Sequence, residues 1–119
     1  MRVAGLGFST GASEADLRAA FERLGATGIS ALATARTKAE APVLRALAEE
    51  LRLPVIAVPE PALAAVRTPT VSPRVEAAFG TGSLAEAAAL VAAGRGARIV
   101  TARVTAGRAT AALAEGEGE

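Results

Sequence analysis

The sequence of 119 residues contains no cysteine, histidine, tryptophan or tyrosine, and only three phenylalanines. Without cysteine and histidine, the chain cannot form disulfides, thiolate nucleophiles, the usual zinc sites or imidazole acid–base catalysts. The scarcity of aromatic side chains also removes the stacking surfaces that bind single-stranded nucleic acids. No segment approaches the ~20 apolar residues of a membrane span, and the first residues lack the pattern of a secretory signal. We therefore expect a cytoplasmic protein with no metal site and no nucleic-acid or membrane partner.

Alanine is the most abundant residue, with 32 copies, so we expect a core of small, closely packed side chains. A chain of this length typically forms one domain, which we place at residues 1–114. Residues 115–119 alternate glutamate and glycine, and we expect this acidic tail to be disordered. Residues 1–114 contain 13 basic and nine acidic residues, a net charge of +4, and Lys38 is the only lysine.

Apolar residues recur at strand and helix spacings along the whole sequence. Strands are predicted at residues 3–8, 29–33, 54–59, 98–105 and 108–114, and helices are predicted to begin near residues 14, 42, 61, 74 and 84. The spacings of Ser13 to Asp16 and of Ser83 to Glu86 are typical of capping boxes. This alternation predicts a three-layer α/β/α sandwich with a mixed sheet of about five strands. The last two strands form an antiparallel hairpin, and we expect the final strand at the sheet edge.

Two starts are possible for the second helix. Thr37 can cap it with Glu40 closing a capping box, or Pro42 can occupy the first helical position, where its missing N–H costs nothing. We favour the second start, because proline inside the helix would remove a hydrogen bond. Lys38 and Glu40 then lie in the loop before the helix.

The segment Gly5-Leu6-Gly7-Phe8-Ser9-Thr10-Gly11 links the first strand to the helix that Ser13 caps. We interpret it as the end of a strand followed by a glycine-rich turn. Such a turn lets the backbone approach a ligand closely, and it directs N–H groups and a helix N-terminus at an anion. The sequence therefore predicts a ligand that carries carboxylate or phosphate groups.

Ligands of open α/β sheets bind beyond the carboxyl ends of the strands. In this sequence those ends bring together hydroxyls, backbone donors and cations, as an anion site requires. Ser83 has helix capping as its alternative role, and Arg103 and Arg108, which flank the final hairpin turn, are expected to face solvent. The candidate ligand-binding residues are Gly7, Ser9, Thr10, Gly11, Thr34, Arg36, Lys38, Thr81 and Ser83.

The spacing Gly5-x-Gly7-x-x-x-Gly11 is close to the fingerprint of dinucleotide-binding proteins. It is one residue longer than G-x-G-x-x-G, and no acidic residue ends the second strand to hold a ribose. The chain is also short for a cofactor domain with a substrate site. A dinucleotide site is therefore disfavoured, and we expect no cofactor.

Four blocks of the sequence, in order, resemble a known family. They are residues 5–11; Ala31-Leu32-Ala33-Thr34 with Lys38-Ala39-Glu40-Ala41-Pro42; residues 70–75 with 80–90; and residues 109–114. With these blocks the sequence is similar, over nearly its whole length, to the cobalamin biosynthesis CobE / CbiG C-terminal domain family. CbiG-type proteins carry further domains before this one, whereas this sequence starts at the glycine turn. It therefore resembles the stand-alone CobE form of the aerobic pathway.

The resemblance implies a role in building the corrin ring. In CbiG-type proteins the reaction opens a lactone on a cobalt-corrinoid intermediate, with loss of a two-carbon aldehyde. Our leading hypothesis is a protein that binds or carries a precorrin-type polycarboxylate, with Arg36 and Lys38 clamping its carboxylates. The alternative is a hydrolase in which Lys38 polarises the lactone carbonyl and Glu40, in a partly apolar setting, activates water. A third hypothesis is a module that docks a precorrin methyltransferase.

Overall fold

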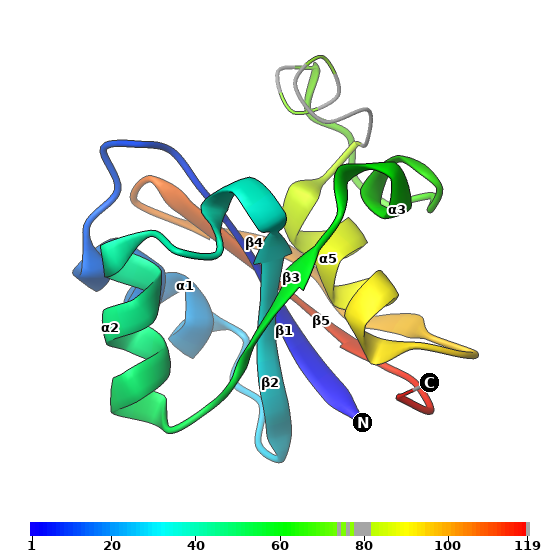
Figure 1. Cartoon of the computed structure of the whole chain (residues 1–119), viewed down its shortest axis with the longest axis horizontal. Coiled ribbons are helices and arrows are strands. Elements are labelled where there is room, and N and C mark those ends of the chain that lie inside the picture. Colours follow the sequence, from blue (N-terminus) through cyan, green and yellow to red (C-terminus); the bar gives the residue numbers. More distant parts are fainter. Residues whose placement is uncertain (74, 76, 78–81, 119) are drawn as a thin grey trace.

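A five-stranded mixed sheet lies at the centre of the computed structural model, which describes residues 1–73, 75, 77 and 82–118 (Figure 1). The elements are β1 (Arg2–Phe8), α1 (Glu14–Arg23), β2 (Ile29–Ala35), the 3-10 helix η1 (Arg36–Lys38), α2 (Pro42–Leu51), β3 (Val55–Val58), α3 (Glu60–Ala64), α5 (Leu84–Ala93), β4 (Arg98–Ala106) and β5 (Ala109–Glu115). The strand order is β3-β2-β1-β5-β4, with the first three strands parallel and β5 antiparallel to both of its neighbours. The predicted mixed sheet and C-terminal antiparallel hairpin are confirmed.

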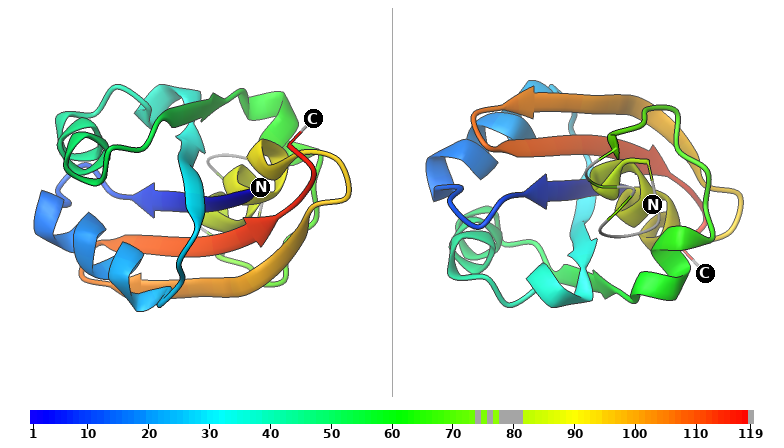
Figure 2. Two further views of the ribbon diagram at one scale, coloured as in Figure 1. Left: turned by 90° about the horizontal axis from the view of Figure 1, so that it is seen from below. Right: turned by 90° about the horizontal axis from the view of Figure 1, so that it is seen from above.

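Helices cover both faces of the sheet and make three layers (Figures 1 and 2). On one face, α1 and α2 pack over a buried cluster that includes Leu6, Leu32 and Leu44. On the other face, α5 and α3 pack over a second cluster that includes Val3 and Leu63. The predicted three-layer sandwich is therefore confirmed. Among the described residues, no helix is both long enough and apolar enough to span a bilayer.

The close approach of α5 to β1 requires small residues in both elements. Alanines line most of the buried length of α5, and Gly5 of β1 lies against the helix backbone. A Cβ atom on Gly5 would overlap the carbonyl oxygen of Ala85 and lie 2.8 Å from the nitrogen of Ala89. Gly5 and Gly7 both lie in β1, as the strand predicted at residues 3–8 requires, and at Gly5 the packing of the helix explains the absence of a side chain.

The position of β5 differs from the sequence-based expectation. We expected this strand at the sheet edge, but it lies between β1 and β4, and β4 forms the edge. The physical reason is visible in the two burial patterns. Most residues of β5 are small, apolar and buried, as an interior strand between helical layers requires, whereas exposed side chains recur along β4.

The last described residues, 115–118, contact the rest of the domain. We expected disorder from residue 115, but Glu115 ends β5, and its carboxylate accepts hydrogen bonds from Arg2 at 3.0 Å and Arg98 at 2.9 Å. These guanidinium groups hold the pKa of Glu115 below its ordinary value. Beyond it, the Gly116 N–H donates to the Met1 carbonyl, and the Gly118 N–H donates to the Ala93 carbonyl. Charge pairing and backbone pairing therefore hold residues 115–118 against the domain.

Most of the predicted helix starts are confirmed. Ser13 and Asp16 form a complete capping box, and Pro42 occupies the first turn of α2 after Ala41. The predicted box at the start of α5 is only half formed: the Ser83 hydroxyl accepts from the Glu86 N–H, but the Glu86 side chain bonds elsewhere. The helix expected near residue 74 falls partly outside the described residues.

Candidate ligand-binding pocket

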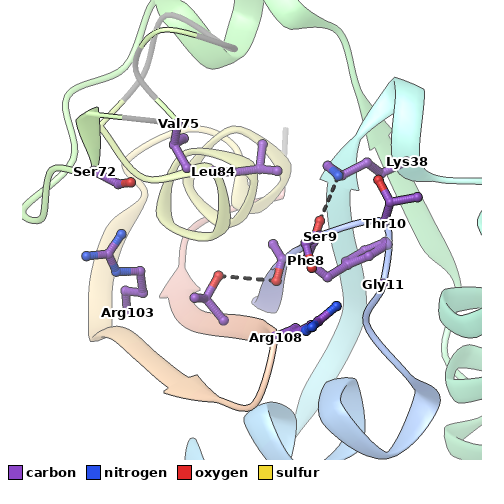
Figure 3. A pocket seen from close by; sticks show the side chains of 12 residues that line it. Phe8, Ser9, Thr10, Gly11, Lys38, Ser72, Val75, Leu84, Arg103 and Arg108 are labelled. Carbon is purple, nitrogen blue, oxygen red and sulfur yellow. Dashed lines mark hydrogen bonds between the residues drawn. The ribbon is translucent and has the colours of Figure 1, made fainter.

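A cavity of about 690 Å³ opens beyond the carboxyl end of β1, between the β4–β5 hairpin and the first turn of α5 (Figure 3). Ligands of open α/β sheets bind at such a place. The volume lies within the range of about 300–1,000 Å³ that small-molecule sites occupy. The lining residues are Gly7, Phe8, Ser9, Thr10, Gly11, Lys38, Ser72, Val75, Leu84, Arg103, Arg108 and Thr110.

Five of the residues predicted from the sequence meet in this cavity, namely Gly7, Ser9, Thr10, Gly11 and Lys38. They meet because β1 ends at Phe8 and the chain then turns, with the Ala12 N–H donating to the Ser9 carbonyl oxygen at 3.1 Å. The turn residues are exposed at the mouth of the cavity. The helix that follows, α1, begins at Glu14, and none of its residues line the cavity, so the helix N-terminus of the anion-site interpretation is not part of this site.

The remaining candidates do not line the cavity. Thr34 is buried in β2, where its hydroxyl donates to the Leu6 carbonyl at 2.8 Å. Ser83 is buried as the cap of α5. Arg36 is exposed on η1 outside the cavity lining. Thr81 lies outside the described residues.

Lys38, the last residue of η1, reaches the carboxyl end of β1 with its side chain. Its ammonium group donates to the Phe8 carbonyl oxygen at 2.7 Å and lies 5.1 Å from the centre of the Phe8 ring (Figure 3). An ammonium group has three donors, so this contact leaves two for other partners. Partial burial, which disfavours the charged form, lowers the pKa of Lys38 from its ordinary value.

Sequence reasoning did not include two cations of the pocket, Arg103 and Arg108, because it expected both to face solvent. Arg108 is indeed exposed, whereas Arg103 is half-buried. Both line the cavity, since β5 pairs with β1 and brings the hairpin turn beside the glycine turn. The Ser9 N–H donates to the Arg108 carbonyl at 3.3 Å, and the Arg108 side chain covers the space that a Cβ on Gly11 would occupy. The strand pairing that carries them there has no local sequence signal.

The cavity combines positive charge with apolar surface. Lys38, Arg103 and Arg108 supply three cations, and the described lining contains no carboxylate. Apolar surface comes from residues of β1, α5 and the segment before it, namely Phe8, Leu84 and Val75. This arrangement suits a ligand that carries anionic groups around an apolar body.

Glu40 has no place in this cavity. Its side chain is 84% exposed and forms an ion pair with Arg45 on α2. It therefore lacks the partly apolar setting that a carboxylate base requires, and Lys38 and Glu40 do not face a common cavity.

Comparison with known proteins identifies the family. Residues 2–114 match the family model described as "Cobalamin synthesis G C-terminus". One similar solved structure is that of CobE, a protein from the cobalamin (vitamin B12) biosynthetic pathway. Its sequence is 35% identical to this chain, the match covers 100% of this chain and 92% of the CobE chain, and the TM-score is 0.86. Cobalamin biosynthesis protein chiG from Agrobacterium tumefaciens str. C58 is 36% identical over 98% of this chain and 99% of its own, with a TM-score of 0.74. A search of curated proteins gave no significant match. This chain therefore belongs to the family of the cobalamin synthesis G C-terminal domain.

Proposed function

We propose that this domain binds a precorrin-type polycarboxylate and carries it between steps of corrin-ring construction in the aerobic cobalamin pathway. The observation that carries the proposal is the cavity that three cations and several apolar side chains line together. Corrin intermediates have acetate and propionate arms around a largely apolar macrocycle. Cations and backbone N–H groups at the rim would bind the arms, while Phe8 and Leu84 would contact the ring.

The pocket favours binding over hydrolysis. A lactone-opening reaction needs a base within hydrogen-bond reach of the attacking water. The described part of the cavity wall carries cations, hydroxyls and apolar groups, and it does not include Glu40, which pairs with Arg45. Binding requires only the groups that are present, so a carrier is the function that the geometry supports best.

Titration of the purified protein with precorrin intermediates, followed by the absorbance of the macrocycle, tests the proposal. We expect saturable binding of one ligand per chain and no turnover. Release of a two-carbon aldehyde by catalytic amounts of protein would instead support the hydrolase alternative. Absence of both binding and turnover would refute both functions and favour the docking of a partner enzyme.

The ionisation of the Lys38 ammonium group predicts how this binding depends on pH. Bound carboxylates favour the ammonium form, so affinity is greatest below the pKa of Lys38 and falls as the pH rises through it. Because burial lowers that pKa, the fall begins at a lower pH than an ordinary lysine would show. Loss of one charge-assisted contact corresponds to roughly a tenfold to hundredfold loss of affinity.

The measurement is the same titration from neutral to alkaline pH, where the ligand carboxylates remain ionised. Lys38→Arg is the matched variant, because guanidinium stays protonated throughout this range. We expect it to bind without the alkaline decline. A wild-type affinity that is independent of pH would remove Lys38 from the binding site.

A further inference from the structure

Glu86 is a fully buried carboxylate in the first turn of α5, and its partners all come from outside that helix. One oxygen accepts from the Thr70 N–H at 3.0 Å and from the Thr70 hydroxyl at 2.9 Å. The other accepts from the Arg103 N–H at 2.7 Å. A buried carboxylate is costly unless donors satisfy it, and here three donors do so.

The bond to Arg103 falls at an irregularity of β4. Thr101 pairs with Leu113 and Val104 pairs with Ala111, so two residues of β4, Ala102 and Arg103, lie opposite one residue of β5. This is a β-bulge, which leaves a backbone group outside the ladder and changes the direction of side chains. After the bulge, Val104 packs against the core on the α1 side, while Arg103 lines the cavity. The Glu86 carboxylate thus caps the bulge that directs Arg103.

The bonds to Thr70 hold the segment that leads to Ser72, which lies on the same side of the cavity as Arg103 (Figure 3). The Thr68 hydroxyl donates to the Thr70 carbonyl at 2.8 Å, which tightens the chain around this residue. Two residues further on, Ser72 lines the cavity, and its N–H donates to the Gly82 carbonyl at 2.6 Å. One carboxylate therefore joins the start of α5, the segment that leads to Ser72, and the strand that carries Arg103.

We propose that Glu86 is a positioning residue for the ligand pocket: by capping the β4 bulge, its carboxylate keeps the Arg103 guanidinium directed into the cavity. The inference rests on the proposed binding function. Glu86 itself is fully buried and does not line the cavity, so it acts through Arg103. Helix capping does not explain this arrangement, since the Glu86 side chain bonds to Thr70 and Arg103 and leaves the cap to the Ser83 hydroxyl, which accepts from the Glu86 N–H.

A double-mutant cycle tests the coupling, with uroporphyrin, an octacarboxylate tetrapyrrole, as the probe. Glu86→Gln keeps the size of the side chain but leaves one oxygen for three donors. The Thr70 segment supplies two of these donors, so the amide NH2 would face the Arg103 N–H and the bulge would lose its cap. We expect Glu86→Gln and Arg103→Gln each to weaken binding about tenfold. If Glu86 acts through Arg103, the double variant will bind no more weakly than Arg103→Gln alone.

Arg108→Gln provides the matched control, because Arg108 lines the same cavity but does not bond to Glu86. In the double variant Glu86→Gln, Arg108→Gln, the losses of binding free energy from the two substitutions should therefore add. Additive losses in both cycles, or equal coupling in both, would overturn the inference, since either result means that Glu86 supports the fold in general. If Glu86→Gln does not fold, Glu86→Asp repeats both cycles with the charge kept and the reach shortened.

A second readout needs no ligand. Hydrogen exchange of the Arg103 amide, measured by NMR, should be slow in the wild type and at least tenfold faster in Glu86→Gln, because exchange reports the loss of the capped N–H. Unchanged exchange would refute the positioning role even if binding changed. Failure of the wild type to bind uroporphyrin and precorrins would instead refute the proposed function, while the exchange result would still decide whether Glu86 caps the bulge.

Discussion

Gly5→Ala will destabilise the protein by about 3 kcal/mol, at the upper end of what overpacking a core typically costs. The added Cβ would overlap the Ala85 carbonyl oxygen and lie 2.9 Å from the Ala85 carbonyl carbon. Both atoms belong to the backbone of α5, so no side-chain rotation relieves the contact, and the helix must move away from β1. Urea or thermal unfolding of the purified variant measures the loss directly.

Gly11→Ala is the control for this prediction. Its Cβ would meet only the flexible guanidinium end of Arg108, which can move into the cavity. We expect its unfolding free energy to stay within about 0.5 kcal/mol of the wild type, as for other surface substitutions. Equal stability of Gly5→Ala and the wild type would show that α5 does not pack this closely on β1.

The combined variant Arg103→Gln, Arg108→Gln will lose about a hundredfold or more in affinity for a polycarboxylate tetrapyrrole. Each guanidinium can supply a charge-assisted hydrogen bond worth about 1.5–3 kcal/mol, which is tenfold or more in affinity. Both side chains line the cavity, and the described lining contains no carboxylate to oppose them. The measurement is the absorbance titration at two salt concentrations, with circular dichroism to verify folding.

Arg36→Gln tests whether the ligand binds in the cavity of the structure or at the Arg36 side chain that the sequence predicted to bind it. It removes the same charge from an exposed residue outside the cavity lining, so we expect less than a threefold change in affinity. A larger loss at Arg36 than at Arg103 and Arg108 would move the site away from the hairpin. It would restore the sequence-based interpretation.

Local signals predicted most of the fold. The Ser13 cap, the Pro42 helix start and the strand bounded by prolines at residues 54–59 depend on neighbouring residues, and the structure confirms them. The position of β5 depends on which strand it pairs with, and no local pattern records that choice. The same pairing brings Arg103 and Arg108 to the glycine turn, so the missed cations and the misplaced strand have one cause.

Two identical spacings in the sequence lead to different hydrogen bonds in the structure. Ser13 to Asp16 and Ser83 to Glu86 have the same separation, yet only the first forms a complete capping box. The first helix begins in solvent, where the nearest partner of Asp16 is the Ser13 N–H. The second begins in the interior, where Thr70 and Arg103 offer other donors to Glu86. The donors that surround a side chain depend on the tertiary structure, so the local sequence does not predict them.

The pairing of Met1 with Gly116 places both ends of the described chain beside each other, at the amino end of β1. The cavity opens at the carboxyl end of the same strand. A tether attached at either end would therefore leave the mouth accessible, so the protein can be immobilised on a sensor surface, or joined to a reporter, without obstructing ligand entry.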